Sequence, residues 1–194
     1  SGDRRTGVFK KVVDQASSWR RQGVEAGIFV ATSPSSAPDW EAQPEVQLVQ
    51  TFGNNFQSFS VQNDLVNAIH AWGPDVTYVR TTPRHAPVQR LLGQLHHVIE
   101  IQTNDLVESK RRSIAHYALA VASRRACLQT ASGLVFVSRE LSRHSSFSRF
   151  TKARTVIGNG IDLNRFDILP APNNLSPRLA FMGSPSIPWQ GLED

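Results

Sequence analysis

The stretch VIGNGIDLNRF, residues 156–166, decides how the rest of this sequence is interpreted. It places a short apolar strand, an Asn-Gly turn, an acid and an aromatic in that order. Such an order is typical of a junction between two domains, although the chain continues only to Asp194. We therefore expect one domain over residues 1–168. A linker and the first strand of a second domain are expected over residues 169–194.

Upstream of this stretch, short apolar runs alternate with segments that have helical periodicity. Strands that alternate with helices predict an α/β fold with a parallel sheet and helices on both faces. The fold class expected from the sequence is therefore a Rossmann-like, doubly wound parallel sheet. The predicted strands are residues 24–32, 45–52, 76–80, 96–103, 134–138, 155–160 and 178–183.

The predicted helices lie between these strands. An amphipathic helix over residues 8–19 ends at Gly23, and a second begins at 61 and stops at the Gly-Pro pair Gly73 and Pro74. The Pro- and Ser-rich residues 33–44 are predicted to be a loop. Two shorter helices, one interrupted by proline near 86–95 and one capped by Ser138, complete the pattern.

The segment after the strand at 96–103 predicts one long helix that continues to Gly133. Asn104 or Asp105 can cap its first turn, and Glu108 follows Asp105 at the spacing of a capping box.

The predicted order of strands and helices lacks a strand at its start. A doubly wound domain opens with a buried strand that leads into the first phosphate-binding turn. Here the sequence begins at the turn itself, with Thr6 and Gly7, so the first strand is missing from the pattern. We expect a gap or an exposed apolar edge beside the first helix, and such an edge invites self-association.

The amino-acid composition limits the class of protein and the kinds of partner that the chain can have. An apolar content of 40% is sufficient for a core, and the single cysteine, Cys127, excludes an internal disulfide and favours a reducing compartment. The sequence shows neither a spanning apolar run nor a signal segment, so we expect a soluble, cytoplasmic protein. The net charge of +5 is a mild bias toward anionic partners, although such an excess is more often a solvated surface.

The first helix carries a candidate anion site. Gly7 precedes it, and Lys10 and Lys11 lie in its first turn, where free backbone N–H groups attract phosphate. Lysines at this end oppose the helix dipole unless an anion is bound. The alternative is that both lysines extend into solvent.

Polar residues also follow the carboxyl ends of several predicted strands. In an open parallel sheet, ligands bind outside these ends, so the residues predict a cleft. Each could instead be a helix cap. They are Arg80, Thr81, Thr103, Asn104, Ser138 and Asn159.

The remaining reactive side chains predict no metal site and no nucleophile. His96 and His97 point to opposite faces of a strand, and His70 and His116 have no acid or cysteine at ligand spacing. Cys127 lies within a helix and is expected to be a packing residue.

Taken in order, four segments resemble the N-terminal half of a GT-B-fold retaining glycosyltransferase of the family four-like group, which uses nucleotide-sugar donors. They are TGVFKKVVDQASSWRRQGVEAGIF (6–29), GLVFVSREL (133–141), VIGNGIDLNRF (156–166) and RLAFMGSPSIPWQGLED (178–194). The resemblance implies an acceptor-side domain followed by the start of a donor-binding domain. It also implies that a chain ending at Asp194 would not transfer sugar by itself.

The resemblance implies roles for individual residues. Asn104 or Thr103 falls beside the transferred sugar, where relatives place a catalytic group. Ser184 and Gln190 stand where relatives often have Arg and Lys, which weakens the expected grip on the diphosphate. The implied donor-binding residues are Gly7, Val8, Lys10, Ser138, Ser184 and Gln190, and the implied acceptor-binding residues are Arg80, Thr81 and Arg84.

The resemblance also implies a nucleotide sugar as co-substrate, no metal cofactor, and a glycan, lipid or small-molecule acceptor. Peripheral membrane contact and self-association stay open as further interactions. Nucleic acid is not expected, because basic residues are scattered and aromatics are not interleaved with them. The run Lys110–Arg112 is interpreted as a solvated helix face. The second hypothesis is a non-catalytic nucleotide- or anion-binding Rossmann-like module.

Overall fold

The computed structural model describes residues 7–51, 53, 55–80, 89–90, 92–160, and the single positions 170, 171, 173, 176 and 178. The chain forms two compact units, Ser1–Gly160 and Ile161–Asp194, and the description below concerns the first. The predicted strand at 178–183 lies almost entirely outside the described residues. Four predicted site residues also lie outside them: Thr81, Arg84, Ser184 and Gln190.

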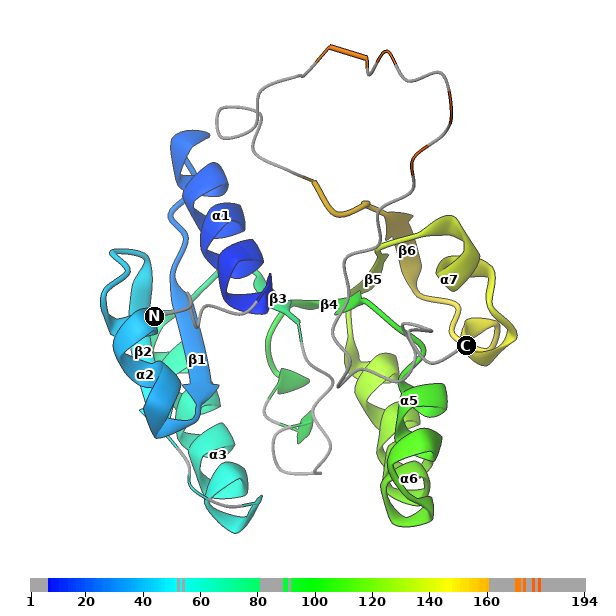
Figure 1. The fold of residues 1–194 in the computed structure, drawn as a ribbon. Helices are drawn as coiled ribbons and strands as arrows, with labels where there is room; N and C mark the ends of the chain where they lie inside the picture. The colour runs from blue at the N-terminus through cyan, green and yellow to red at the C-terminus, as the bar shows by residue number, and fades with distance from the viewer. Residues whose placement is uncertain are drawn as a thin grey trace. The chain divides into compact units, whose positions relative to one another are not determined.

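All strand pairs in the described part of the chain are parallel. One sheet contains two strands in the order β1-β2, and another contains four in the order β3-β4-β5-β6 (Figure 1). With helices on both sides, this arrangement confirms the predicted Rossmann-like α/β class. The strands are β1 (Ile28–Thr32), β2 (Val46–Thr51), β3 (Thr77–Val79), β4 (His97–Ile101), β5 (Gly133–Phe136) and β6 (Ala153–Val156).

The helices alternate with these strands along the chain. Gly23 and Gly73 follow the first and third helices with positive φ, of 84° and 69°, which confirms both as stop residues. Ser138 caps the last helix, since its side chain accepts a hydrogen bond from the Leu141 N–H. The helices are α1 (Gly7–Arg21), α2 (Ala37–Glu41), α3 (Asn55–Trp72), α5 (Asp105–Arg112), α6 (Ile114–Thr130) and α7 (Arg139–Arg143).

The predicted loop at 33–44 contains more structure than expected. A 3₁₀ turn at Pro34–Ser36 leads into α2, which buries Trp40. The Trp40 ring packs edge-on against Phe9 of α1, with ring centroids 4.7 Å apart. Burial of the Trp40 side chain stabilises α2, a short helix whose Pro- and Ser-rich sequence would not be stably helical by itself.

The prediction of one long helix that reaches Gly133 is also wrong, because the helix breaks at Ser113. This residue has extended backbone angles, and its side chain accepts a hydrogen bond from the His116 N–H. It therefore ends α5 and caps α6, and the two helices pack side by side (Figure 1). The second helix ends at Thr130, and Gly133 is instead the first residue of β5.

The expected capping box at the start of α5 is likewise corrected. Asn104 occupies the N-cap position, but its side chain makes no capping hydrogen bond. The carboxylate of Asp105 accepts a hydrogen bond from Arg124 Nε at 3.0 Å, which ties α5 to α6. Arg124 also stacks over the Phe147 ring, 4.2 Å from its centroid.

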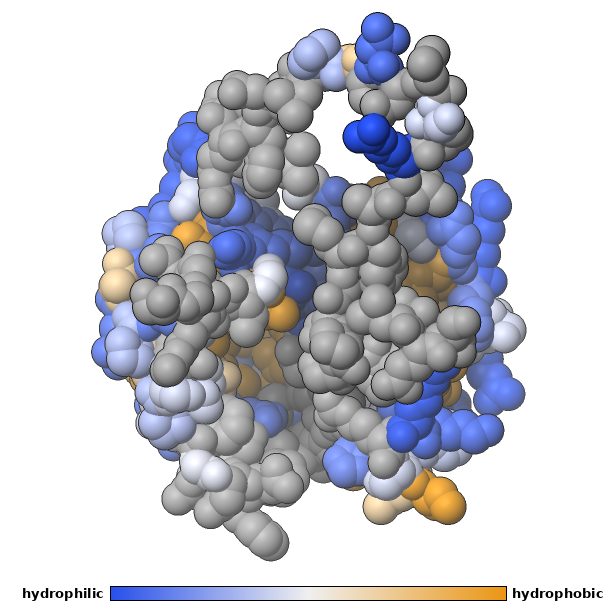
Figure 2. Space-filling model, viewed as in Figure 1, coloured by the Kyte–Doolittle hydropathy of each residue, from blue (hydrophilic) through white to orange (hydrophobic). Residues whose placement is uncertain are grey.

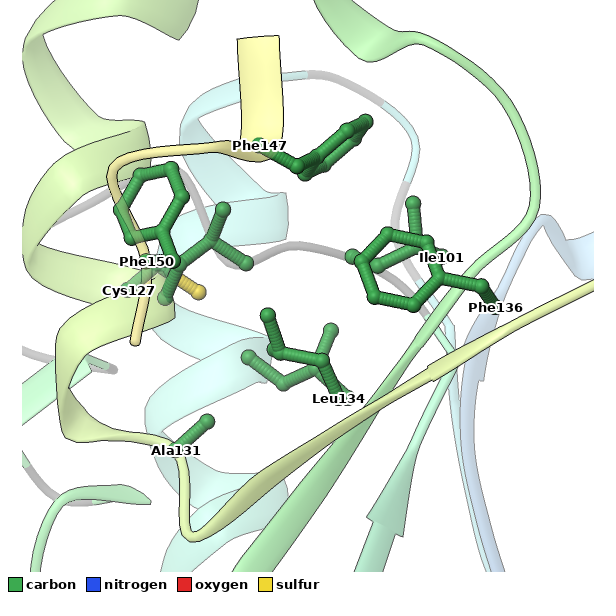
Figure 3. Close-up of a cluster of buried hydrophobic side chains, with 9 residues drawn as sticks. Ile101, Cys127, Ala131, Leu134, Phe136, Phe147 and Phe150 are labelled. Atoms are coloured by element: carbon green, nitrogen blue, oxygen red, sulfur yellow. The ribbon is translucent and has the colours of Figure 1, made fainter. Parts of the chain in front are cut away.

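The main core lies between α6 and the inner strands of the larger sheet (Figure 3). Phe136 packs edge-on against Phe147, with centroids 5.2 Å apart. Burial raises the pKa of the Cys127 thiol to about 12, and the nearby charge of Asp105 adds to this shift. The prediction that Cys127 is a packing residue is therefore confirmed. The cluster comprises Ile99, Ile101, Cys127, Leu128, Ala131, Leu134, Phe136, Phe147 and Phe150.

The strands do not form one continuous sheet in the described part of the chain. β1 pairs only with β2, and β3 pairs only with β4. α1 nevertheless contacts strands of both sheets: it packs on β1 through Phe9 and Ala16, and its Trp19 ring lies 5.4 Å from the Tyr78 ring of β3. This division agrees with the gap expected beside the first helix.

Candidate functional site at the strand ends

The carboxyl ends of the four parallel strands of the larger sheet lie at one edge. Arg80 follows β3, and Thr103 and Asn104 follow β4. Ser138 follows β5, and Asn159 follows β6. The local sequence explains this placement, since each apolar strand ends where polar residues begin.

Arg80 is held at this edge by the neighbouring strand. Its Nη2 donates a hydrogen bond to Gln102 Oε1 at 2.8 Å, and Gln102 Nε2 donates to the Arg80 carbonyl at 3.4 Å. The Nε and Nη1 atoms of Arg80 are buried and have no hydrogen-bond partner among the described residues. A buried guanidinium N–H without a partner is costly, so a ligand oxygen could satisfy it.

Asn104 lies beside a histidine that the sequence did not single out. Its Nδ2 is 3.3 Å from Nδ1 of His144, and its buried Oδ1 has no hydrogen-bond partner in the described part. His144 follows α7 and also accepts a hydrogen bond from the Ser146 N–H at 3.2 Å. No local pattern marked His144, because its partner is 40 residues away in the chain.

A buried charged cluster connects the first helix to the sheet. Lys11 Nζ donates to Glu100 Oε1 at 2.6 Å and to Asn159 Oδ1 at 2.7 Å. Tyr78 donates its hydroxyl to Glu100 Oε2 at 2.7 Å. The Glu100 side chain is 2% exposed and that of Lys11 is 26% exposed. The Asn-Gly turn at Asn159 is therefore tied to both α1 and β4.

This cluster revises the expectation for the two lysines. Lys11 turns inward, so the solvent alternative is wrong for it, whereas Lys10, Gly7 and Val8 are exposed. The pattern did contain a signal for Glu100, which is the one acid within the apolar strand HVIEI.

The cluster raises the pKa of Tyr78. Burial is the largest cause, and the hydrogen bond and negative charge of Glu100 add to it. Because the folded state favours the neutral phenol, the stability contributed by Tyr78 is complete below the unfolded tyrosine pKa of about 10 and is lost as the pH rises above it.

We therefore expect Tyr78→Phe to weaken the alkaline loss of stability, measured by melting temperature between about pH 8 and pH 11. The Cys127 thiol contributes to the same pH range, so the loss should not vanish. Tyr117→Phe is the matched control, since Tyr117 is exposed on α6 and should keep the parent profile. A Tyr78→Phe profile equal to that of the parent would contradict the argument.

The structure brings some predicted site residues together and not others. Ser138 serves as the α7 cap, which is the alternative that the sequence left open. That Gly7, Arg80, Asn104 and Ser138 line one shared cleft stays a prediction. Among the described residues, no group of three or more His, Cys, Asp or Glu side chains could hold a metal ion. No helix described here is long and apolar enough to cross a membrane.

Comparison with known proteins identifies the domain. The family model described as a glycosyl transferase 4-like domain matches residues 6–160, a range that ends at the Asn159–Gly160 turn. A family of this kind indicates an enzyme of the transferase kind, with a sugar donor and an acceptor in general. Comparisons with curated proteins and with solved structures found no match.

Proposed function

Since the chain belongs to the glycosyl transferase 4-like domain family, we propose that it transfers a sugar from a nucleotide-sugar donor to an acceptor hydroxyl, with retention. In this proposal, residues 1–168 form the acceptor-side domain of a GT-B enzyme. Residues 169–194 begin the donor-binding domain. The reaction needs no metal cofactor and takes place in the cytoplasm.

The observation that carries this proposal is the side chain of Arg80. Two of its nitrogen atoms, Nε and Nη1, are buried at the strand-end edge without a partner in the described residues. A neighbouring strand holds the guanidinium in place through Gln102. A planar cation with free donors suits oxygen-rich ligands such as sugars and phosphates. We assign Arg80, Thr81 and Arg84 to the acceptor side.

The other roles follow the resemblance. By the resemblance, the residues proposed to bind the donor are Gly7, Val8, Lys10, Ser138, Ser184 and Gln190. Asn104 and Thr103 lie beside the transferred sugar. His144 joins this group, because its ring lies against the Asn104 amide. These donors stabilise the negative charge of the leaving diphosphate. The acceptor hydroxyl oxygen bonds to the anomeric carbon, the bond from that carbon to the diphosphate oxygen breaks, and the hydroxyl proton passes to the leaving diphosphate.

Among the described residues, β1 and β3 each keep one edge unpaired, which supports a further part of the proposal, self-association. Unpaired parallel strand edges present free backbone groups to a second chain.

The test of transfer is a donor-consumption assay with a panel of nucleotide sugars, on this chain and on a version extended past Asp194. We expect turnover in the extended version. In that version, Arg80→Met should lower kcat/KM by about 10–100-fold, because a lost hydrogen bond to a charged group costs about 1.5–3 kcal/mol. The matched control is Arg149→Met, because Arg149 is exposed in the turn before β6.

Two outcomes would count against the proposal. Equal turnover from both versions would contradict the two-domain arrangement. If neither version turns over but free nucleotides still raise the melting temperature, the protein is the non-catalytic binding module instead.

A further inference from the structure

Arg80 is partly buried and has no carboxylate partner in the described part of the chain. Of the arginines whose side-chain burial is described, only Arg80 and Arg124 are not exposed. Arg124 forms an ion pair with Asp105 at 3.0 Å. Arg80 instead donates to the neutral amide of Gln102, and its Nε and Nη1 atoms are buried without a partner. A charge removed from water is costly unless an opposite charge compensates it, so this guanidinium is complementary to an anion.

The acid near Arg80, Glu100, is already engaged by other side chains. Burial raises the pKa of Tyr78, Glu100 adds to this rise, and the charge of Arg80 opposes it, so both charges lie near the Tyr78 hydroxyl. Oε1 of Glu100 accepts a hydrogen bond from Lys11 at 2.6 Å, and Oε2 accepts one from Tyr78 at 2.7 Å. Two cations, Lys11 and Arg80, therefore face one anion, and this group of side chains keeps a net positive charge.

A second polar atom without a partner lies two residues past Gln102. Oδ1 of Asn104 is buried, has no hydrogen-bond partner among the described residues, and can only accept. The Cα atoms of Gln102 and Asn104 are at most about 7 Å apart, since each residue adds no more than about 3.6 Å. A ligand the size of a sugar can therefore reach both Arg80 and Asn104. The surface of α1, whose Lys11 contacts this edge, is mostly hydrophilic (Figure 2), so it offers an apolar ligand little area.

We infer that the acceptor is a small hydroxylated molecule that carries a carboxylate or a phosphate group, such as a sugar acid or a sugar phosphate. Its anionic group accepts hydrogen bonds from the unpartnered nitrogens of Arg80, and one of its hydroxyls donates to Oδ1 of Asn104. The inference rests on the proposed function, because it takes the strand-end edge as the acceptor site.

The test is isothermal titration calorimetry on the whole chain, without a donor. The probes are the uronates and the 6-phosphates of glucose, mannose and galactose, each beside its neutral parent sugar, and inorganic phosphate alone. We expect at least one anionic sugar to bind about tenfold or more tightly than its neutral parent, and this binding to weaken as salt is added. Whether the uronates or the phosphates bind identifies the anionic group. Inorganic phosphate should bind less tightly than a sugar phosphate, because it lacks the sugar hydroxyls.

Matched variants assign the effect to Arg80. Arg80→Met should lower the affinity for the anionic sugar about tenfold or more, to that of the neutral parent, and should leave the affinity for the neutral sugar unchanged. Arg149→Met removes the same charge from an exposed position and should bind like the parent protein. Arg80→Lys keeps the charge but not the planar set of donors, so its affinity should be intermediate. Melting temperatures show whether each variant folds, and if Arg80→Met does not, Arg80→Lys decides the question.

The inference is wrong if no anionic sugar binds more tightly than its neutral parent. It is also wrong if Arg80→Met and Arg149→Met weaken binding equally, which would indicate a general effect of net charge. In the extended version, turnover with neutral acceptors alone would keep the proposed function and overturn this inference. Binding of an anionic sugar through Arg80 without any turnover would support the ligand class and refute the transfer reaction.

Discussion

Replacing Lys11 with Met should lower the free energy of unfolding by about 3 kcal/mol, the lower end of the range for breaking a buried ion pair. The Glu100 carboxylate is 2% exposed and Lys11 is its only salt-bridge partner in the described chain. Without Lys11, this buried negative charge would keep only the Tyr78 hydroxyl as a hydrogen-bond partner among the described residues. Because the Lys11 side chain is partly exposed, water can reach this site and replace part of the lost hydrogen bonding to Glu100. We therefore do not expect a loss of stability at the upper end of that range.

Urea denaturation of the variant beside the parent measures this loss. Lys10→Met is the matched control, because Lys10 is exposed in the same helical turn and should change stability by no more than about 0.5 kcal/mol. The double variant Lys11→Met with Glu100→Gln should recover much of the loss, since it leaves no charge unpaired. Equal losses from Lys11→Met and Lys10→Met would show that the buried pair does not stabilise the fold.

Replacing Phe136 with Ala should cost about 3–5 kcal/mol of stability, the range for removing a fully buried phenylalanine. Phe136 is 0% exposed in the main core, and its ring is edge-on to that of Phe147 (Figure 3). The loss combines the transfer free energy of the ring with the cavity that it leaves. A natural domain is stable by only about 5–15 kcal/mol, so this variant should be close to unfolding.

The measurement is again the urea midpoint, with the slope expected to stay near the parent value. Phe136→Leu should cost less than Phe136→Ala, because it keeps most of the apolar volume. Val24→Ala, at an exposed position, should stay within about 0.5 kcal/mol of the parent. A Phe136→Ala variant as stable as Val24→Ala would mean that the side chain is not held in a closely packed core.

Local signals predicted most of the elements because their physical causes are local. Gly23 and Gly73 end helices through positive φ, which glycine adopts without a steric penalty. Ser138 caps α7 through a hydrogen bond three residues along the chain. The alternation of strands with helices predicted a parallel sheet, because a helix between two strands lets the chain return to the same end of the sheet.

Where local signals competed, the prediction failed. Asn104, Asp105 and Ser113 can each cap a helix, and the sequence does not show which side chain has a better partner elsewhere. The Asp105 carboxylate accepts a hydrogen bond from Arg124 of α6, and the Asn104 amide lies beside the His144 ring. Ser113 has no such competing partner among the described residues and caps α6. The short helix α2 depends on the contact of Trp40 with Phe9, a residue far upstream.

The sequence by itself determined the alternation of strands and helices, the helix stops, and the edge of the sheet where polar residues gather. The tertiary structure alone decided that Lys11, rather than Lys10, turns inward to Glu100 and Asn159, and that Tyr78 donates its hydroxyl to the same Glu100 carboxylate. It also decided that β1 and β3 stay unpaired with each other. The physical reason is that periodicity shows which face of an element is covered, whereas the partner on that face comes from residues distant in the chain.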